Sequence, residues 1–165
     1  MDHPPTDRPP QIETDLQTGP VSIEPLDWPA DCGAEACFLG RTRSEVHPEM
    51  GALQRLEYEV YEPMVRSRMR QLAQEAAARF DCRRVRMVHA MGPVQIGQAS
   101  VVIQVAAPHR GEAFAACRHL IDTLKHDLPI WKREIWQHGE TFVEGCCAQS
   151  RDSSSAADAT GRTHA

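Results

Sequence analysis

Short runs of apolar residues divide the N-terminal half of the chain into predicted strands and one polar loop. We expect strands over residues 21–23, which have prolines on both sides, and over residues 34–39, which are mostly apolar and end at Gly40. Residues 41–51 are polar and contain a proline and a glycine, which predicts a loop. In residues 53–60 apolar and polar side chains alternate over most of the segment, which is typical of a strand with one buried face.

Two segments have the spacing of amphipathic helices. The first runs from Glu62 to about Arg79, with a proline in the first turn, where its missing N–H costs no hydrogen bond. The second covers about residues 110–128, and Pro129 prevents its continuation. The predicted apolar stripe of this second helix consists of Ala113, Phe114, Cys117, Leu120, Ile121 and Leu124.

The remaining apolar runs predict four more strands. Residues 85–91 alternate, and the Gly-Pro pair at 92–93 is expected to end that strand. Residues 99–107 are nearly continuous in valine, isoleucine and alanine, which indicates burial on both faces. Residues 130–136 and 141–143 are separated by a His-Gly turn. The order β-β-β-α-β-β-α-β-β predicts an α+β fold, with two main helices packed on mostly antiparallel strands.

The two ends of the chain differ in composition from the middle. Residues 1–11 contain four prolines, and residues 146–165 are mainly Ser, Ala, Thr and Asp. Neither segment can bury enough apolar surface to offset its ordering entropy, so both are predicted to be disordered tails. We therefore expect one folded domain over residues 12–145.

Composition and charge exclude several classes of protein. The net charge of −5 argues against nucleic-acid binding, which requires a basic surface. No apolar run approaches the roughly 20 residues that cross a bilayer, and no secretory signal is recognisable, so we expect a cytoplasmic protein. The six cysteines form no C-x-x-C pair, which argues against a zinc site. Cys117, on an apolar helix face, is expected to be a small core residue.

Two lysines near the end of the second predicted helix are candidates for acid–base or nucleophilic chemistry. Lys125 lies in the last turn, and Pro129 forces a chain reversal that returns Lys132 toward the same region. Two ammonium groups placed close together disfavour each other's charge, which suits a general acid, a general base or an amine nucleophile. The alternative is a lysine that interacts with the helix dipole and a second lysine exposed on a strand, and spacing alone favours this alternative.

Two further cationic groups follow predicted strands. His109 and Arg110 open the second helix, where amide N–H groups, the helix dipole and a guanidinium together form an anion site. An exposed helix start with a surface ion pair explains His109 and Arg110 equally well. Arg41, Thr42 and Arg43 follow a glycine that permits close backbone approach, although a solvated loop is the simpler explanation.

Two other conspicuous side chains are assigned to packing. Tyr58 is expected to be a core or interface aromatic, and His89, on a predicted strand, a core histidine with satisfied hydrogen bonds. Neither is a candidate for the site.

Five sequence blocks carry a resemblance to a known family. In chain order they are FLGRTR (38–43), LEYEVYEPM (56–64), APHR (107–110), EAFAACRHLIDTLK (112–125) and PIWKRE (129–134). In this order and at these separations they resemble the large, catalytic subunit of molybdopterin synthase, the MoaE family. The resemblance covers about residues 20–145 and favours the functional interpretation of the lysines and arginines.

The resemblance implies a fold, an assembly and a reaction. The fold is an α+β hammerhead-type domain that forms a homodimer, and each protomer binds a small ubiquitin-like subunit, giving a heterotetramer. The C-terminal thiocarboxylate of that subunit supplies sulfur in two successive transfers. The substrate is cyclic pyranopterin monophosphate, and the product is the dithiolene of molybdopterin. No metal and no other cofactor is implied.

The resemblance also implies roles for individual residues, all in the blocks just quoted. Lys125 and Lys132 would be catalytic, with Lys125 beside the thiocarboxylate and Lys132 in acid–base chemistry or opening of the cyclic phosphate. The implied substrate-binding residues are Arg41, Thr42, Arg43, His109, Arg110, Arg133 and Glu134. Two alternatives remain, a dimeric scaffold that binds the ubiquitin-like protein without turnover and a domain that binds a phosphorylated metabolite.

Overall fold

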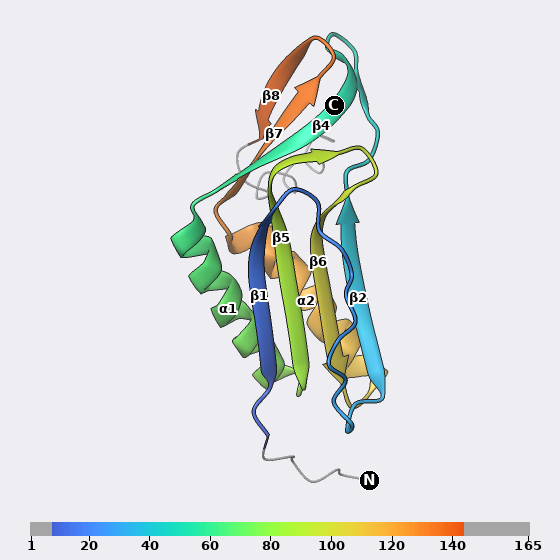
Figure 1. Cartoon of the computed structure of the whole chain (residues 1–165), viewed down its shortest axis with the longest axis vertical. Coiled ribbons are helices and arrows are strands. Elements are labelled where there is room, and N and C mark those ends of the chain that lie inside the picture. The colour runs from blue at the N-terminus through green and yellow to red at the C-terminus, as the bar shows by residue number, and fades with distance from the viewer. Residues whose placement is uncertain (1–7, 144–165) are drawn as a thin grey trace, which may run out of the picture.

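Eight strands and two helices make up the described part of the chain, residues 8–143 of a computed structural model (Figure 1). In chain order they are β1 (Gln11–Thr18), β2 (Ala34–Arg41), β3 (Val46–His47), β4 (Gly51–Val60), α1 (Glu62–Arg79), β5 (Arg84–Gln95), β6 (Ala99–Ala107), α2 (Arg110–Asp127), β7 (Ile130–Trp136) and β8 (Gly139–Val143). The predicted C-terminal tail, and the predicted N-terminal tail up to residue 7, lie outside the described residues.

The strands form one sheet in the order β2-β6-β5-β4-β7-β8, with β1 paired to β5 and β3 paired to β4. Only β1 and β5 run parallel, and every other pairing in residues 8–143 is antiparallel. The prediction of an α+β fold with mostly antiparallel strands is therefore confirmed. We call β1, β2, β6 and the first half of β5 the body sheet, and β4, β7 and β8 the head sheet, which Figure 1 shows at opposite ends of the molecule.

Strand β5 connects the two parts of the sheet because it changes partners along its length. Residues 84–89 pair with β6, whereas residues 92–95 pair with β4. The prediction that β5 ends at Met91 is wrong. Gly92 takes a φ of +71°, which a glycine adopts without strain, and the strand bends there and continues into the head sheet. Pro93 is tolerated because it sits at a bend where the pairing changes.

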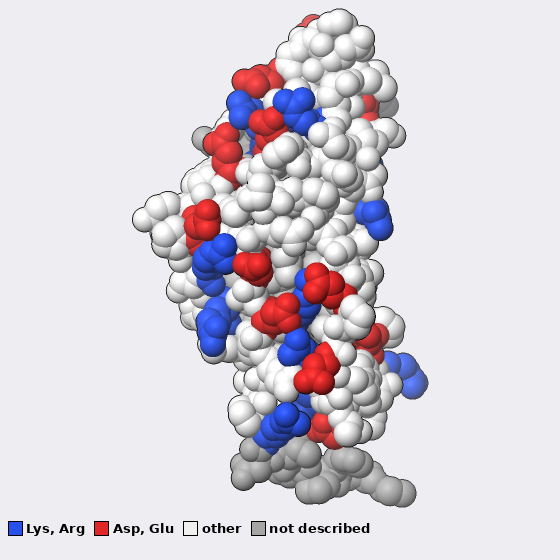
Figure 2. All heavy atoms as spheres, in the orientation of Figure 1, with Lys and Arg blue, Asp and Glu red and all other residues white. Residues whose placement is uncertain are grey.

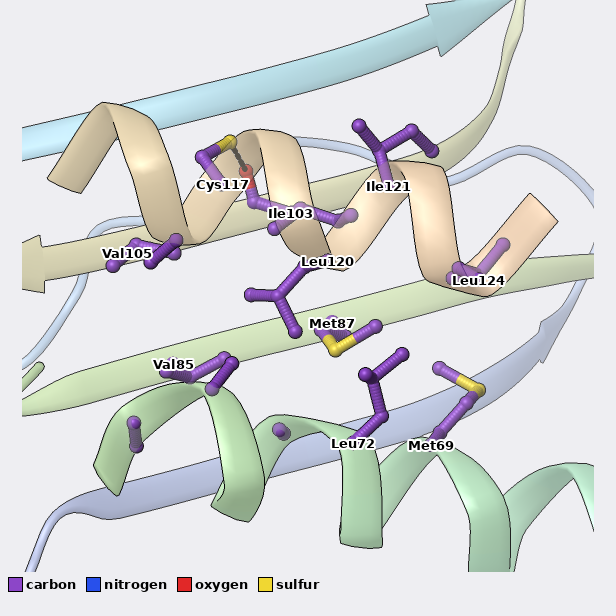
Figure 3. Close-up of a cluster of buried hydrophobic side chains, with 14 of the residues drawn as sticks. Met69, Leu72, Val85, Met87, Ile103, Val105, Cys117, Leu120, Ile121 and Leu124 are labelled. Atoms are coloured by element: carbon purple, nitrogen blue, oxygen red, sulfur yellow. Dashed lines mark hydrogen bonds between the residues drawn. The ribbon is translucent and has the colours of Figure 1, made fainter. Parts of the chain in front are cut away.

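The two helices cover one face of the body sheet, behind it in Figure 1. Helix α1 packs on β1 and β5, and α2 packs on β2 and β6. Figure 3 shows the fully buried side chains that meet between the layers, including Met69 and Leu72 of α1, Met87 of β5 and Leu120 of α2. The predicted stripe of α2 is confirmed except for Phe114, which is 66% exposed because its neighbours Ala113 and Cys117 take the inward positions.

The N-terminal region differs most from prediction. Residues 21–23 do not form a strand, because the flanking prolines lack N–H donors, and Val21 makes only a single bridge to Ala99. The first strand is instead β1, whose sequence QIETDLQT is largely polar and buries only Leu16. Its hydrogen bonds come from parallel pairing with β5, a partner more than sixty residues away that no local pattern indicates.

The face of the body sheet opposite the helices carries a partly buried ionic network. The guanidinium of Arg86, 4% exposed, bonds Glu13 at 2.9 Å and Gln104 at 3.0 Å and pairs with Glu24 at 3.1 Å. These contacts fasten the segment between β1 and β2 across the sheet. In Figure 2, which shows this face, acidic and basic side chains are interspersed and form no continuous basic stripe.

Candidate active site

A cavity of about 420 Å³ lies where the body sheet, the head sheet and the end of α2 meet. Four cationic side chains line it, and two carboxylates accompany them: Arg41, Arg43, Lys125, Lys132, Glu45 and Glu134. Neutral polar side chains form another part of the wall, namely Thr42, Tyr58, His89 and Ser100. The remaining lining is apolar, apart from Gly40. The excess of positive charge and the apolar wall suit an anionic organic ligand.

The end of β2 brings the loop arginines to the cavity. A Cβ at Gly40 would lie 2.7 Å from the Val101 side chain, so only glycine permits this approach, as predicted. The pairing with β6 shifts register between Gly40 and Arg41, which bends the strand. The Arg41 guanidinium then donates to the Gly97 carbonyl oxygen at 2.8 Å, which orients this cation at the cavity wall.

Thr42 is the one buried residue of this segment. Its backbone bonds the turn between β5 and β6 through Gln98 and Gly97, at 2.9 and 2.8 Å. Its side chain is 3% exposed, and the hydroxyl oxygen has no hydrogen-bond partner in the structure. A buried hydroxyl without a partner carries a desolvation cost that a bound ligand would remove.

The end of α2 places Lys125. The helix ends at Asp127, one residue before the predicted end, and Leu128 is already extended. The Ile130 N–H donates to the Leu128 carbonyl oxygen at 2.8 Å, which closes a tight three-residue turn around Pro129. The chain turns at Pro129 but does not reverse, because β7 continues from the end of α2 into the head sheet (Figure 1). The turn nevertheless leaves Lys125 and Lys132 on the wall of one cavity.

Lys132 and Glu134 project to the same side of β7 because side chains alternate along a strand. The Lys132 ammonium lies 3.0 Å from a Glu134 carboxylate oxygen, and both side chains are mostly buried. Arg133 projects to the other side. There it pairs with Glu57 at 2.8 Å and approaches Glu59 and Glu140, and it does not line the cavity.

Of the neutral polar side chains, sequence analysis identified Thr42 as a site residue but not Tyr58, His89 or Ser100. The Tyr58 hydroxyl donates to the Ser100 hydroxyl at 3.1 Å, and its ring meets the His89 ring edge-on at 5.1 Å. Burial lowers the pKa of His89 to about 4, so the ring is neutral at physiological pH. The expectation that His89 is buried is confirmed, but it lines the cavity as well. Only tertiary structure reveals this, because the three residues come from three strands.

His109 and Arg110 lie at the start of α2, the end of the helix far from Lys125. Both are exposed, and neither lines the cavity of this chain. The structure therefore does not bring this pair together with the lysines within one chain.

The described cysteines are structural or peripheral. Cys117 is 6% exposed and its thiol lies 4.0 Å from the Ile103 carbonyl oxygen (Figure 3), which confirms it as a core residue. Burial raises its pKa to about 11, so it stays a thiol. The pair Cys146-Cys147 lies outside the described residues. Within residues 8–143 no cluster of three His, Cys, Asp or Glu side chains is placed to hold a metal ion, and no helix is long and apolar enough to cross a membrane.

Known proteins resemble this chain in sequence and in fold. The family model described as "MoaE protein" matches residues 15–127. A molybdopterin synthase catalytic subunit from Nostoc sp. is 40% identical over 149 residues, which cover 86% of this chain and 89% of the relative.

Two solved structures share the fold. The crystal structure of molybdopterin synthase from Staphylococcus aureus aligns with a TM-score of 0.68 and 29% identity over 78% of this chain and 94% of that one. A chain in the complex of subunits 1 and 2 of molybdopterin-converting factor from Helicobacter pylori aligns with a TM-score of 0.64 over 84% of this chain and 91% of that one, and its 22% identity supports the fold alone. The chain therefore belongs to the MoaE family, the catalytic subunits of molybdopterin synthase, which are sulfurtransferases of molybdenum-cofactor biosynthesis.

Proposed function

We propose that the cavity binds cyclic pyranopterin monophosphate and that Lys125 and Lys132 promote its sulfuration. The sulfur comes from the C-terminal thiocarboxylate of a small ubiquitin-like subunit. The observation that carries this proposal is the meeting of both lysines with Arg41, Thr42 and Arg43 around one cavity of about 420 Å³. A volume of this size is typical of sites that enclose a small organic ligand.

The phosphate is assigned to the cationic side of the cavity. The Arg41 guanidinium, held by Gly97, and the exposed Arg43 supply positive charge, and guanidinium groups bind phosphate oxygens in pairs of hydrogen bonds. The unpartnered Thr42 hydroxyl is a further donor. Together these three side chains would bind an anionic ligand. A scaffold protein without turnover would have no need for such a binding site.

The two lysines have different surroundings, which favours different roles. Lys132 is ion-paired with Glu134, so it is held in place and suits proton donation or stabilisation of charge when the cyclic phosphate opens. Lys125 lies at the exposed end of α2, where the C-terminus of a partner subunit has access. Each thiocarboxylate carries one sulfur, so two donor molecules are consumed for each dithiolene.

His109 and Arg110 enter this proposal only through a second copy of the chain. They lie too far from Lys125 in one protomer to touch the same small ligand. In a homodimer, the start of α2 from one protomer would supply its anion-binding groups to the cavity of the other. Arg133 lies outside the cavity and is paired with carboxylates, so it has no part in pterin binding in this proposal.

The small subunit is the proposed partner because the Helicobacter pylori neighbour of the same fold is a complex of subunits 1 and 2 of molybdopterin-converting factor. The proposed assembly is a homodimer of this chain with one small subunit on each protomer.

Reconstitution tests the proposal. The full chain is mixed with a thiocarboxylated small subunit and cyclic pyranopterin monophosphate, and the dithiolene product is followed by mass spectrometry. We expect product with the wild-type chain and a loss of at least about a hundredfold in rate for Lys125→Ala, with unchanged dimerisation. Partner binding without product would favour the scaffold alternative, and tight pterin binding that is independent of the partner would favour the metabolite-binding alternative.

A further inference from the structure

Three consecutive polar contacts connect Trp136, in the core of the head sheet, with Lys132 at the cavity wall. The Trp136 indole N–H donates to the Thr141 hydroxyl at 2.8 Å, and that hydroxyl donates to one Glu134 carboxylate oxygen at 3.0 Å. The other Glu134 oxygen lies 3.0 Å from the Lys132 ammonium. Neither Thr141 nor Trp136 lines the cavity.

The direction of the hydrogen bonds follows from the chemistry of the groups. An indole N–H is a donor only, so the Thr141 hydroxyl oxygen accepts there. Its single hydrogen is then directed to Glu134, and a bond of this kind to a carboxylate is stronger than one between neutral groups. Both carboxylate oxygens of Glu134 are thereby occupied, one by a donor from β8 and one by Lys132.

The hairpin geometry builds this arrangement into the fold. Glu134 and Thr141 are direct partners in the antiparallel pairing of β7 and β8. Lys132, Glu134 and Trp136 alternate along β7 and so share one side of it. Trp136 is 7% exposed, packs with Leu53 and Leu56, and contacts the His47 ring at 5.5 Å, so the far end of the chain of contacts is fixed in the head-sheet core.

We propose that Thr141 and Trp136 are positioning residues for Lys132. A lysine side chain has four rotatable bonds, and a carboxylate held only by that lysine would turn with it. The Thr141 hydroxyl fixes the plane of the Glu134 carboxylate, and the carboxylate in turn fixes the ammonium at the cavity wall. This inference deepens the proposed function, because it rests on Lys132 contributing to turnover.

Removal of the Thr141 hydroxyl tests the proposal in the reconstituted system with the thiocarboxylated small subunit. Thr141→Val keeps the shape of the side chain, and we expect its kcat to fall between roughly tenfold and a hundredfold with little change in KM, because displacement of a catalytic group by about 1 Å has effects of this size. Thr141→Ser restores the hydroxyl and should recover most of the loss.

A double-mutant cycle separates positioning from a general structural defect. If Thr141 acts through Glu134, Thr141→Val should lower kcat no further in a Glu134→Gln background. The same fold loss in both backgrounds, or a wild-type kcat for Thr141→Val, would overturn the proposal. Lys132→Ala in the same assay distinguishes a failure of the catalytic assignment of Lys132 from a failure of the positioning role of Thr141. Full activity of that variant would overturn the catalytic assignment of Lys132 and the positioning role with it, whereas an impaired Lys132→Ala beside a fully active Thr141→Val would overturn the positioning role alone.

Discussion

Arg110 begins helix α2 and Lys125 lies in its last turn, so the two residues are roughly 22 Å apart along the helix axis of one protomer. Both belong to the set of residues proposed to act on one substrate molecule. A small pterin phosphate cannot span that distance. The proposed site therefore combines Lys125 of one protomer with Arg110 of its partner.

Mixed dimers test this arrangement. Lys125→Ala and Arg110→Ala homodimers should each have strongly reduced turnover. A heterodimer of one copy of each variant contains one site with both changes and one site with neither, so activity should return to about half of the wild-type value per dimer. The heterodimer is purified with two different affinity tags and assayed in the reconstituted reaction. Activity no higher than that of the Arg110→Ala homodimer would contradict a site that combines Lys125 of one protomer with Arg110 of its partner.

The stability of the protein should depend on the ionisation of His89 below neutral pH. Burial lowers its pKa from 6.5 to about 4, so the unfolded chain binds a proton between these values and the folded chain does not. Stability is therefore fully present above pH 6.5 and is lost as the pH falls toward 4. At pH 4.5 the loss from this group is about 2 kcal/mol.

His89→Gln provides the comparison, because an amide does not titrate in this range. Urea unfolding at one protein concentration, at pH 7 and pH 4.5, gives the free energy of unfolding for both proteins. Carboxylates such as Asp15, whose pKa the Arg66 guanidinium lowers, contribute equally to both. An equal loss in the two proteins would mean that His89 is protonated in the folded state.

Gly92 should be required for its backbone conformation rather than for space. Its φ is +71°, and a Cβ there would meet no atom within 4 Å. Gly92→Ala should therefore destabilise the protein by about 1 kcal/mol, the conformational cost alone. Gly111→Ala, in the first turn of α2 and equally open, should be neutral or stabilising. Urea unfolding of both variants measures the difference, and equal effects would contradict the role of the bend.

Sequence predicted those parts of the fold that depend on residues close to one another in the chain. The ends of α1 and α2 depend on prolines and on apolar spacing within each segment, and they lie within a residue or so of prediction. Strand β1 was missed because it is stabilised by a distant parallel partner and buries one large side chain, Leu16. The continuation of β5 was missed because a glycine–proline pair normally indicates the end of a strand. Only the pairing with β4, which local sequence does not reveal, shows that the strand continues.

The residues of the candidate site also fall into those that sequence predicted and those that only the tertiary structure reveals. Lys125, Lys132 and the loop residues 41–43 belong to the sequence blocks that resemble the MoaE family, and the structure places them around one cavity. Tyr58, His89 and Ser100 come from three strands and have no common local pattern. Thr141 is a single threonine near the end of the described chain, and its relation to Lys132 exists only through the pairing of β7 with β8.

Substitutions of Thr42 should affect substrate binding and the free energy of unfolding separately. Its buried hydroxyl has no partner, so Thr42→Val should leave the free energy of unfolding unchanged or raise it. If the hydroxyl donates to the substrate phosphate, the same variant should raise KM for cyclic pyranopterin monophosphate by roughly tenfold. Thr42→Ser should show the opposite pattern, a KM near that of the wild type and a loss of about 1 kcal/mol from the missing methyl group. Steady-state kinetics and urea unfolding measure the two quantities. A wild-type KM for Thr42→Val would remove Thr42 from the binding site, and marked destabilisation would show that the hydroxyl has a partner in the folded protein.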